Sequence, residues 1–378
     1  MRRNRNGAVI SSTQTARPET LGPVRQTYAG TDDFPPLTRV YSQLSNVVRE
    51  MGLYRRAHVF YALVGAALIL ALAGAVAGFI LLGDSWFQLL IAGALGIIFT
   101  QIAFLAHEAA HRQVLASGPA NVRLARILAG IVGLSLSWWD SKHSRHHANP
   151  NRVSKDPDIE VDTISFLDED AAQARGLRRA ITRHQGWLFF PLLTLEGLNL
   201  HVLSIVHLAS PGKVKGRWLE IGIITARFAV LLVPLFLMLP VGMAFAFLGV
   251  QLAVFGVYMG ASFAPNHKGM PVIAKDAKLD FFSKQVRTSR NISGGWWATT
   301  LMGGLNYQIE HHLFPNMARP NLARARAVVR EVCETRDVPY TETTLIESYG
   351  IVVRYLNRVG LAARDPFDCP AAAQFGRS

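Results

Sequence analysis

Residues 59–111 read VFYALVGAALILALAGAVAGFILLGDSWFQLLIAGALGIIFTQIAFLAHEAAH. This stretch contains two uncharged apolar runs, residues 59–82 and 86–105, which are separated only by Gly83-Asp84-Ser85. Each run is long enough for a helix to cross a bilayer core of about 30 Å. The short polar break predicts that the two helices form a hairpin through a membrane.

A second pair of apolar runs, residues 221–240 and 241–265, lies in the C-terminal half and contains Arg227 as its only charge. The two runs meet at Leu239-Pro240-Val241-Gly242. The 378-residue chain is 50% hydrophobic and has a positive mean hydropathy. We therefore expect an all-α integral membrane protein with four transmembrane helices in two hairpins, and a cytoplasmic helical cap.

The basic residues predict how the hairpins are oriented, because lysine and arginine concentrate in cytoplasmic segments near the membrane. Nine arginines precede residue 58, fourteen lysines or arginines lie in residues 112–217, and fifteen follow residue 265. The turns near Asp84 and Pro240 contain none. We therefore expect both termini in the cytoplasm and a multi-pass protein of a bacterial inner membrane. The net charge of +13 is attributed to this topology and to anionic lipids, with no nucleic-acid partner.

The remaining segments divide the chain further. Residues 124–139 are too short for a span and residues 187–209 contain several polar side chains, so both are expected to be helices at the membrane interface. Residues 321–336 and 342–359 are predicted to be helices over the cytoplasmic face. The expected division is a flexible tail at 1–40, a membrane domain at 41–345, and a C-terminal helix and tail at 346–378.

Three histidine-rich clusters lie near the ends of the apolar segments. They are His107-Glu-Ala-Ala-His111, His143-Ser-Arg-His146-His147 and Gln308-Ile-Glu-His311-His312. Residues three and four apart lie on one face of a helix, so each cluster can direct its imidazoles to one point. An even number of expected spans separates the clusters, which places all three on the cytoplasmic face.

Seven clustered histidines exceed the four ligands of a structural zinc site and are enough for two metals if further ligands come from elsewhere. Imidazole alone suits zinc, copper, iron and nickel. The HExxH pattern at residues 107–111 would fit a zinc metalloprotease with Glu108 as its base, but the other five clustered histidines would then have no role. The three clusters together therefore indicate a buried transition-metal site.

The order of the clusters, with the sequences around them, resembles the membrane fatty acid desaturases over roughly residues 35–345. The supporting motifs are Trp139-Asp-Ser-Lys142, Asn149, Asp156-Pro-Asp-Ile159, Asn266-His-Lys-Gly-Met-Pro271 and His311-His-Leu-Phe-Pro315. The glutamine that leads the third cluster is similar to the branch that includes front-end and acyl-CoA desaturases. The likeness is highly specific for the superfamily and less so for the branch.

The resemblance implies a centre of two iron ions (Fe2+/Fe3+) and O2-dependent insertion of a double bond into an acyl chain. The implied catalytic and metal-binding residues are His107, His111, His143, His146, His147, His267, His311 and His312. Gln308 occupies a ligand position of the related family motif, and we expect it to make a weak or water-mediated contact. The carboxylates of Glu108, Glu310, Asp156 and Asp158 either orient imidazoles or serve as ordinary structural groups.

The expected partners are a fatty acyl substrate, carried as acyl-CoA or acyl-lipid, membrane lipids and a separate electron donor. The sequence has no nucleotide-binding glycine loop, no CxxC motif and no His-Pro-Gly-Gly haem motif. It therefore departs from desaturases with a fused cytochrome b5 domain, and a ferredoxin, a cytochrome b5 or a reductase would supply electrons. The alternatives are a related di-iron hydroxylase and, outside enzymes, a membrane metal sensor or transporter.

Overall fold

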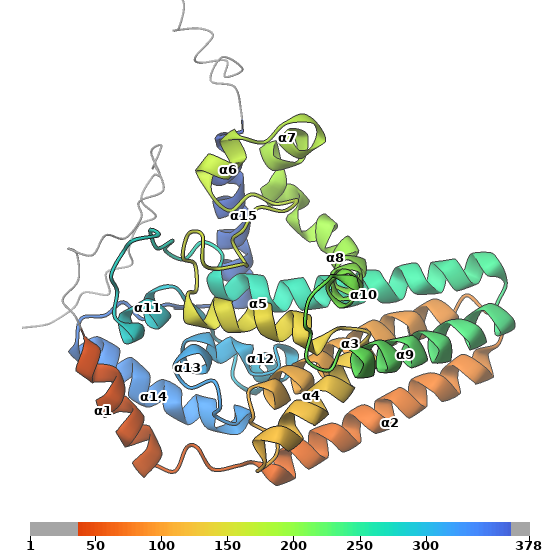
Figure 1. Cartoon of the computed structure of the whole chain (residues 1–378), viewed down its shortest axis with the longest axis horizontal. Helices are drawn as coiled ribbons and strands as arrows, with labels where there is room; N and C mark the ends of the chain where they lie inside the picture. Colours follow the sequence, from red (N-terminus) through yellow and green to blue (C-terminus); the bar gives the residue numbers. More distant parts are fainter. Residues whose placement is uncertain (1–36, 364–378) are drawn as a thin grey trace, which may run out of the picture.

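The computed structural model describes residues 37–363, and these residues form an almost entirely helical protein (Figure 1). The helices are α1 (Thr38–Glu50), α2 (His58–Leu82), α3 (Gln88–Ala110), α4 (Gly118–Val132), α5 (Leu136–Ala148), α6 (Asp168–Ala172), α7 (Gly176–Arg183), α8 (Gln185–Ala209), α9 (Arg217–Met238), α10 (Val241–His267), α11 (Phe281–Arg287), α12 (Trp296–Leu301), the 3-10 helix η1 (Leu305–Tyr307), α13 (Gln308–Leu313), α14 (Arg319–Thr335) and α15 (Leu345–Leu361). The expected tails lie outside the described residues, except that α1 begins at Thr38.

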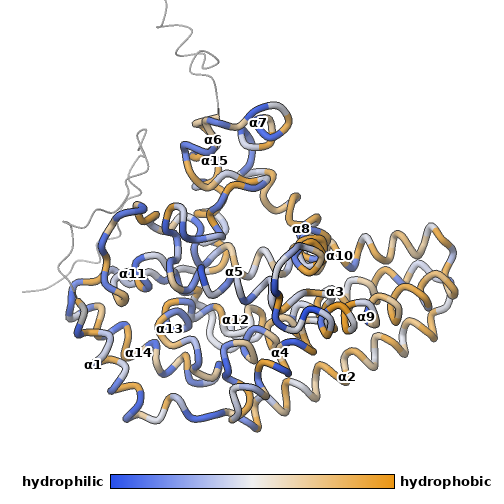
Figure 2. Tube along the Cα trace, viewed as in Figure 1, coloured by the Kyte–Doolittle hydropathy of each residue, from blue (hydrophilic) through white to orange (hydrophobic). Residues whose placement is uncertain are grey.

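The two expected hairpins are present as α2 with α3 and α9 with α10. These helices extend together on one side of the molecule and are apolar along their length (Figures 1 and 2). Five helices among the described residues are long and apolar enough to cross a membrane, because α8 meets the same criterion. The all-α membrane architecture is thus confirmed, while length and composition allow one span more than the four expected.

The expectation that residues 124–139 form one helix is wrong. The chain breaks between α4 and α5, and the two helices are bent by 112°. Gly133 ends α4 with φ of 97°, a left-handed conformation that glycine adopts readily. Ser135 then begins α5 by accepting a hydrogen bond from the Trp138 amide at 3.2 Å. The break redirects the chain so that α5 starts in a new direction and carries the second histidine cluster.

The polar end of the molecule is assembled from the short helices and the C-terminal segment. A buried apolar core joins α1, α11, α13 and α14, and α15 packs against α8 and α10. A parallel pair of two-residue strands, β1 (Asn291–Ile292) and β2 (Glu342–Thr343), connects two parts of this end. The helices predicted at 321–336 and 342–359 correspond to α14 and α15.

Helices α8 and α10 approach each other closely at a pair of glycines. A Cβ atom at Gly197 would lie 2.2 Å from the Leu252 carbonyl oxygen, and one at Gly256 would lie 2.4 Å from both the Gly197 nitrogen and the Leu193 carbonyl oxygen. Small residues allow helix backbones to pack at such short separation. Any larger side chain at Gly256 has to push one backbone away from the other.

We expect Gly256→Leu to destabilise the protein by about 3 kcal/mol or more, because the added atoms meet backbone and not a flexible side chain. The measurement is thermal unfolding of the detergent-purified protein. Gly249→Leu is the matched control, since a Cβ at Gly249 on the same helix has no neighbour within 4 Å. Equal stability of the two variants would contradict the close helix crossing.

Candidate metal centre

The predicted histidines, including His267, converge at one end of the hairpins. They come from the end of α3, from α5, from the last residue of α10 and from α13. Their nitrogens form two groups, and within each group the ligand atoms lie within 4.8 Å of one another. The first group contains His107, His111, His143, His147 and His311, and the second contains His146, His267 and His312.

Helical spacing explains how each cluster serves the two groups. On α5, His143 and His147 are four residues apart and share a face directed to the five-histidine group, while His146 points to the three-histidine group. On α13, the neighbours His311 and His312 divide in the same way. The groups are adjacent, because the rings of His147 and His312 stack with centroids 4.2 Å apart.

Several imidazole nitrogens in these groups are buried and have no hydrogen-bond partner among the described residues. They are both ring nitrogens of His147 and the Nε2 atoms of His311 and His312. The Nε2 atoms of His111 and His143 face each other at 2.9 Å. A buried polar atom without a partner is costly, and convergent neutral nitrogens are the donors that iron and other transition metals accept. The residues therefore fit a pair of metal ions.

The protonation state of the histidines also suits metal binding. Burial lowers the pKa of His111 to about 4. Burial and the neighbouring histidines hold the pKa values of four further imidazoles well below their usual value, those of His143, His147, His311 and His312. Because a histidine must be neutral to bind a metal, these residues need no deprotonation at neutral pH.

Three hydrogen-bond partners orient the rings of the three-histidine group. His146 Nδ1 lies 3.0 Å from an Asp156 carboxylate oxygen, His267 Nδ1 donates to the Thr288 carbonyl at 2.9 Å, and His312 Nδ1 donates to Gln285 Oε1 at 2.9 Å. Each contact leaves Nε2 facing the group. Burial alone would lower the pKa of His146, but the carboxylates of Asp156 and Asp158 raise it.

Asp156 is itself fixed by backbone donors. Its carboxylate accepts hydrogen bonds from the amides of Asn151 at 2.7 Å and Asp158 at 2.9 Å, and it is fully buried. Asp158 lies at 3.4 Å from His146 and pairs with Lys142 at 3.1 Å. Of the two alternatives left open by the sequence, Asp156 therefore matches the one in which a carboxylate orients a histidine, while Asp158 pairs with a basic neighbour.

Gln308 lies beside the three-histidine group. Its Nε2 atom is 2.9 Å from His267 Nε2, and its Oε1 atom accepts a hydrogen bond from Asn266 Nδ2 at 3.2 Å. The side chain is 2% exposed, so water reaches it poorly. The amide is therefore held at the edge of the ligand group by Asn266, the residue next to His267.

Glu108 and Glu310 do not orient imidazoles, and neither is solvated. Glu108 forms a buried ion pair with Arg319, whose Nε donates to the carboxylate at 2.8 Å. Glu310 accepts hydrogen bonds from Asn291 Nδ2 at 2.7 Å and from the Tyr340 hydroxyl at 2.9 Å. Burial raises the pKa of Glu310 to about 7. Both glutamates are next to a histidine in the sequence, but their side chains lie on a different face of the helix from the imidazoles.

Arg290 is a residue that the sequence did not single out. Its guanidinium is 1% exposed and donates to the carbonyls of Pro265 and Lys268, both at 2.9 Å, while its backbone amide donates to Asn266 O at 2.8 Å. These acceptors surround His267 at the end of α10. Pro265 has no amide hydrogen, so it cannot donate the helical hydrogen bond to the Ala261 carbonyl. The Tyr349 hydroxyl donates to that carbonyl instead, at 2.9 Å.

We expect Arg290→Met to lower the free energy of unfolding by about 1–3 kcal/mol, because the Lys268 carbonyl loses its side-chain donor while the Pro265 carbonyl keeps the Ser348 hydroxyl as a donor. The end of α10 should loosen, so the variant should also bind metal at His267 more weakly. Arg330→Met is the control, because Arg330 is 53% exposed and pairs with Glu334 on its own helix. Thermal unfolding and metal content of the purified proteins are the measurements, and a change no larger than in the control would contradict the role.

Comparison with known proteins supplies independent information. Residues 84–344 match the family model for fatty acid desaturases. The chain is 29% identical over 348 residues to the Delta(8)-fatty-acid desaturase of Helianthus annuus, covering 87% of this chain and 75% of that protein. It is 28% identical to the acyl-lipid (9-3)-desaturase of Borago officinalis (87% and 76% covered), and 26% identical to the Delta 8-(E)-sphingolipid desaturase of Lachancea kluyveri (92% and 65% covered).

Proposed function

The chain belongs to the fatty acid desaturase family, and from that premise we propose that it is an O2-dependent enzyme that introduces a double bond into an acyl chain. The observation that carries this proposal is the pair of histidine groups with buried, unpartnered nitrogens. In the net reaction an acyl chain, O2, two electrons and two protons give the unsaturated chain and two waters. The relatives are oxidoreductases of this class by name.

We assign one iron to the five-histidine group and one to His146, His267 and His312, with the Gln308 amide at the edge of the second site. A bound pair of irons supplies O2 activation strong enough to oxidise an unactivated methylene. The chain provides neutral nitrogen donors and excludes water around them. Asp156, Thr288 and Gln285 hold three of the rings so that Nε2 faces the metal.

For the topology we propose four spans, α2, α3, α9 and α10, with α8 lying against them. The second cluster on α5 precedes α8, and His267 at the end of α10 follows it. Because α9 and α10 together cross the membrane twice, a crossing by α8 would place His267 opposite His146. Their Nε2 atoms are 3.3 Å apart, which supports the proposal that both ends of α8 lie on the same side.

The basic residues outside the hairpin turns support a cytoplasmic location for this side, the termini and the histidine groups. An external electron donor, a ferredoxin, a cytochrome b5 or a reductase, belongs to the proposal. The relatives come from plants, mouse and a yeast, so a bacterial inner membrane has no support from them.

The test is expression of the full chain in a host of simple lipid composition together with a competent electron donor. We expect new unsaturated fatty acids whose double bonds are located by mass spectrometry. The matched control is the His143→Ala variant, which should produce none at equal expression. A hydroxylated product would favour the related hydroxylase, and absence of any new lipid with an active donor would contradict the function.

A further inference from the structure

Three polar side chains of the apolar helices α8 and α9 contact the chain at the break between α4 and α5. They are His201 on α8, and Glu220 and Arg227 on α9. Glu220 is 1% exposed and His201 is 5% exposed. Because a buried polar group is costly without a partner, the meeting of all three at one place in the fold indicates a common role.

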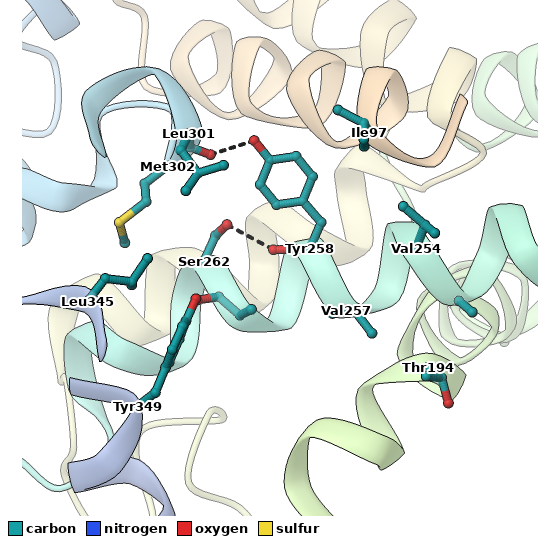
Figure 3. Close-up of a pocket in the computed structure, with 12 residues that line it drawn as sticks. Ile97, Thr194, Val254, Val257, Tyr258, Ser262, Leu301, Met302, Leu345 and Tyr349 are labelled. Atoms are coloured by element: carbon teal, nitrogen blue, oxygen red, sulfur yellow. Dashed lines mark hydrogen bonds between the residues drawn. The ribbon is translucent and has the colours of Figure 1, made fainter. Parts of the chain in front are cut away.

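These three groups do not belong to the groove that runs along α10. That groove, of about 560 Å³, is lined mainly by apolar side chains, among them Ile97, Val254 and Val257 (Figure 3). The Tyr258 hydroxyl at the groove is paired within the protein, because it donates to the Leu301 carbonyl at 2.6 Å. None of the three polar residues at the break lines the groove. Their partners lie instead in the backbone and side chains around the break.

Two of these side chains hold the end of α4, where the last carbonyls have no partner within the helix. Arg227 Nε donates to the Ile131 carbonyl at 3.3 Å, and His201 Nε2 lies 3.1 Å from the Val132 carbonyl oxygen. A Cβ atom at Gly133 would lie 2.6 Å from His201 Nε2, so the break packs tightly against α8. Neighbouring helices thus supply the partners that backbone groups at such a break need where water is excluded.

The third side chain, Glu220, holds the start of α5. One of its carboxylate oxygens accepts hydrogen bonds from Ser135 Oγ at 2.6 Å and from Ser137 Oγ at 2.9 Å, and the Ser137 amide lies 3.3 Å from both oxygens. The other oxygen accepts from Arg126 Nε on α4 at 3.0 Å. A negative charge is stabilising at the N-terminus of a helix, and Ser135 is the residue that caps α5. Glu220 therefore joins α4, α5 and α9 at one point.

The position of α5 matters because this helix contains the histidines of the second cluster. His147 lies ten residues after Ser137, which is about 15 Å along a helix. A tilt of about 5° at the start of α5 would move His147 by about 1 Å over that length. Metal–ligand distances vary by only about 0.2 Å. The far end of α5 is held separately, since Gln285 Nε2 donates to the His147 carbonyl at 2.9 Å, so contacts at both ends fix the axis of the helix.

We propose that Glu220 is a positioning residue of the metal centre, which holds the start of α5 and so brings the histidines of the second cluster into place. It acts through its hydrogen bonds to Ser135 and Ser137 and belongs to neither histidine group. The inference rests on the proposed function through its assignment of two metal ions, and it does not require the reaction itself. Arg227 and His201 contribute by holding the end of α4 on the other side of the break.

The test is titration of the metal-free full chain in detergent with Co(II), followed by visible absorption, which reports the ligands and the geometry around the ion. Glu220→Gln preserves the shape of the side chain but offers one acceptor oxygen in place of two. We expect several-fold weaker Co(II) binding and an altered absorption spectrum. Ser137→Ala removes a partner on α5 and should alter the spectrum in the same way, and it should add little when combined with Glu220→Gln. It also repeats the test if Glu220→Gln does not fold.

Ile224→Ala is the matched control, because Ile224 is 4% exposed on the same helix, one turn after Glu220. The cavity should lower thermal stability and leave the Co(II) spectrum unchanged. Wild-type affinity and spectrum in Glu220→Gln, or the same spectral change in Ile224→Ala, would overturn the positioning role. A wild-type chain that binds no Co(II) would overturn the metal assignment together with the inference. If the variants behave as expected but cells form no new double bonds, the proposed reaction fails while the role of Glu220 stands.

Discussion

His147→Ala should strip most of the iron from the purified protein. Both ring nitrogens of His147 are buried and unpartnered, and its ring lies between the two histidine groups, with centroids 4.4 Å from His143 and 4.2 Å from His312. The substitution removes one ligand from the five-histidine group. It also removes the ring that stacks on His312 of the three-histidine group. We expect about two irons per chain in the wild type and a several-fold reduction in the variant.

The measurement is metal analysis of protein expressed with iron and purified without added chelator. His58→Ala is the matched control, because His58 is exposed at the start of α2 and belongs to neither group. The control should keep the iron of the wild type. Since the protein can lose metal by unfolding, thermal unfolding of both variants is recorded in parallel. Full iron occupancy in a folded His147→Ala variant would refute the ligand assignment.

Glu108→Ala should destabilise the protein by about 3–5 kcal/mol, because it leaves the guanidinium of Arg319 buried without its counter-charge. Arg319 is 5% exposed and Glu108 is 2% exposed. The Tyr61 hydroxyl also lies 3.1 Å from the carboxylate. The pair joins the end of α3 to the beginning of α14, so its loss should loosen the contact between the first hairpin and the polar end.

Unfolding in mixed micelles by titration with dodecyl sulfate measures this effect. The control is Glu334→Ala, which removes a partner of Arg330 in an exposed pair on one helix. Exposed pairs contribute about 0.3–0.5 kcal/mol, so the control should change little. A double variant, Glu108→Leu with Arg319→Met, should recover much of the lost stability because no charge stays buried. An effect of Glu108→Ala as small as that of the control would contradict the buried pair.

The sequence was sufficient for the hairpins and for most of the histidines that the structure brings together, since both depend on local spacing. An uncharged run of residues 59–82 specifies a membrane helix by its length, and histidines three and four apart share a helix face wherever the helix lies. His267 was an exception, because a single histidine after an apolar run has no spacing signal. It was found only through the family resemblance.

Other features required contacts between distant parts of the chain. Glu108 and Arg319 are 211 residues apart, and the sequence near Glu108 suggested a partner for histidine. Arg290 is ordinary in sequence and becomes important only because the carbonyls at the end of α10 surround it. The break at Gly133 was missed because apolar residues continue across it. The structure shows that the bend gives α5, which contains the second histidine cluster, a new direction.

The sequence by itself determined that this protein is a helical membrane protein with histidine clusters able to bind metal, because apolar length and helical period act within one segment. The tertiary structure alone decided how the histidines divide into groups of five and three and which carboxylate orients a ring. The physical reason is that a ligand group is defined by distances between segments. Those distances follow from how the helices pack, which no single segment encodes.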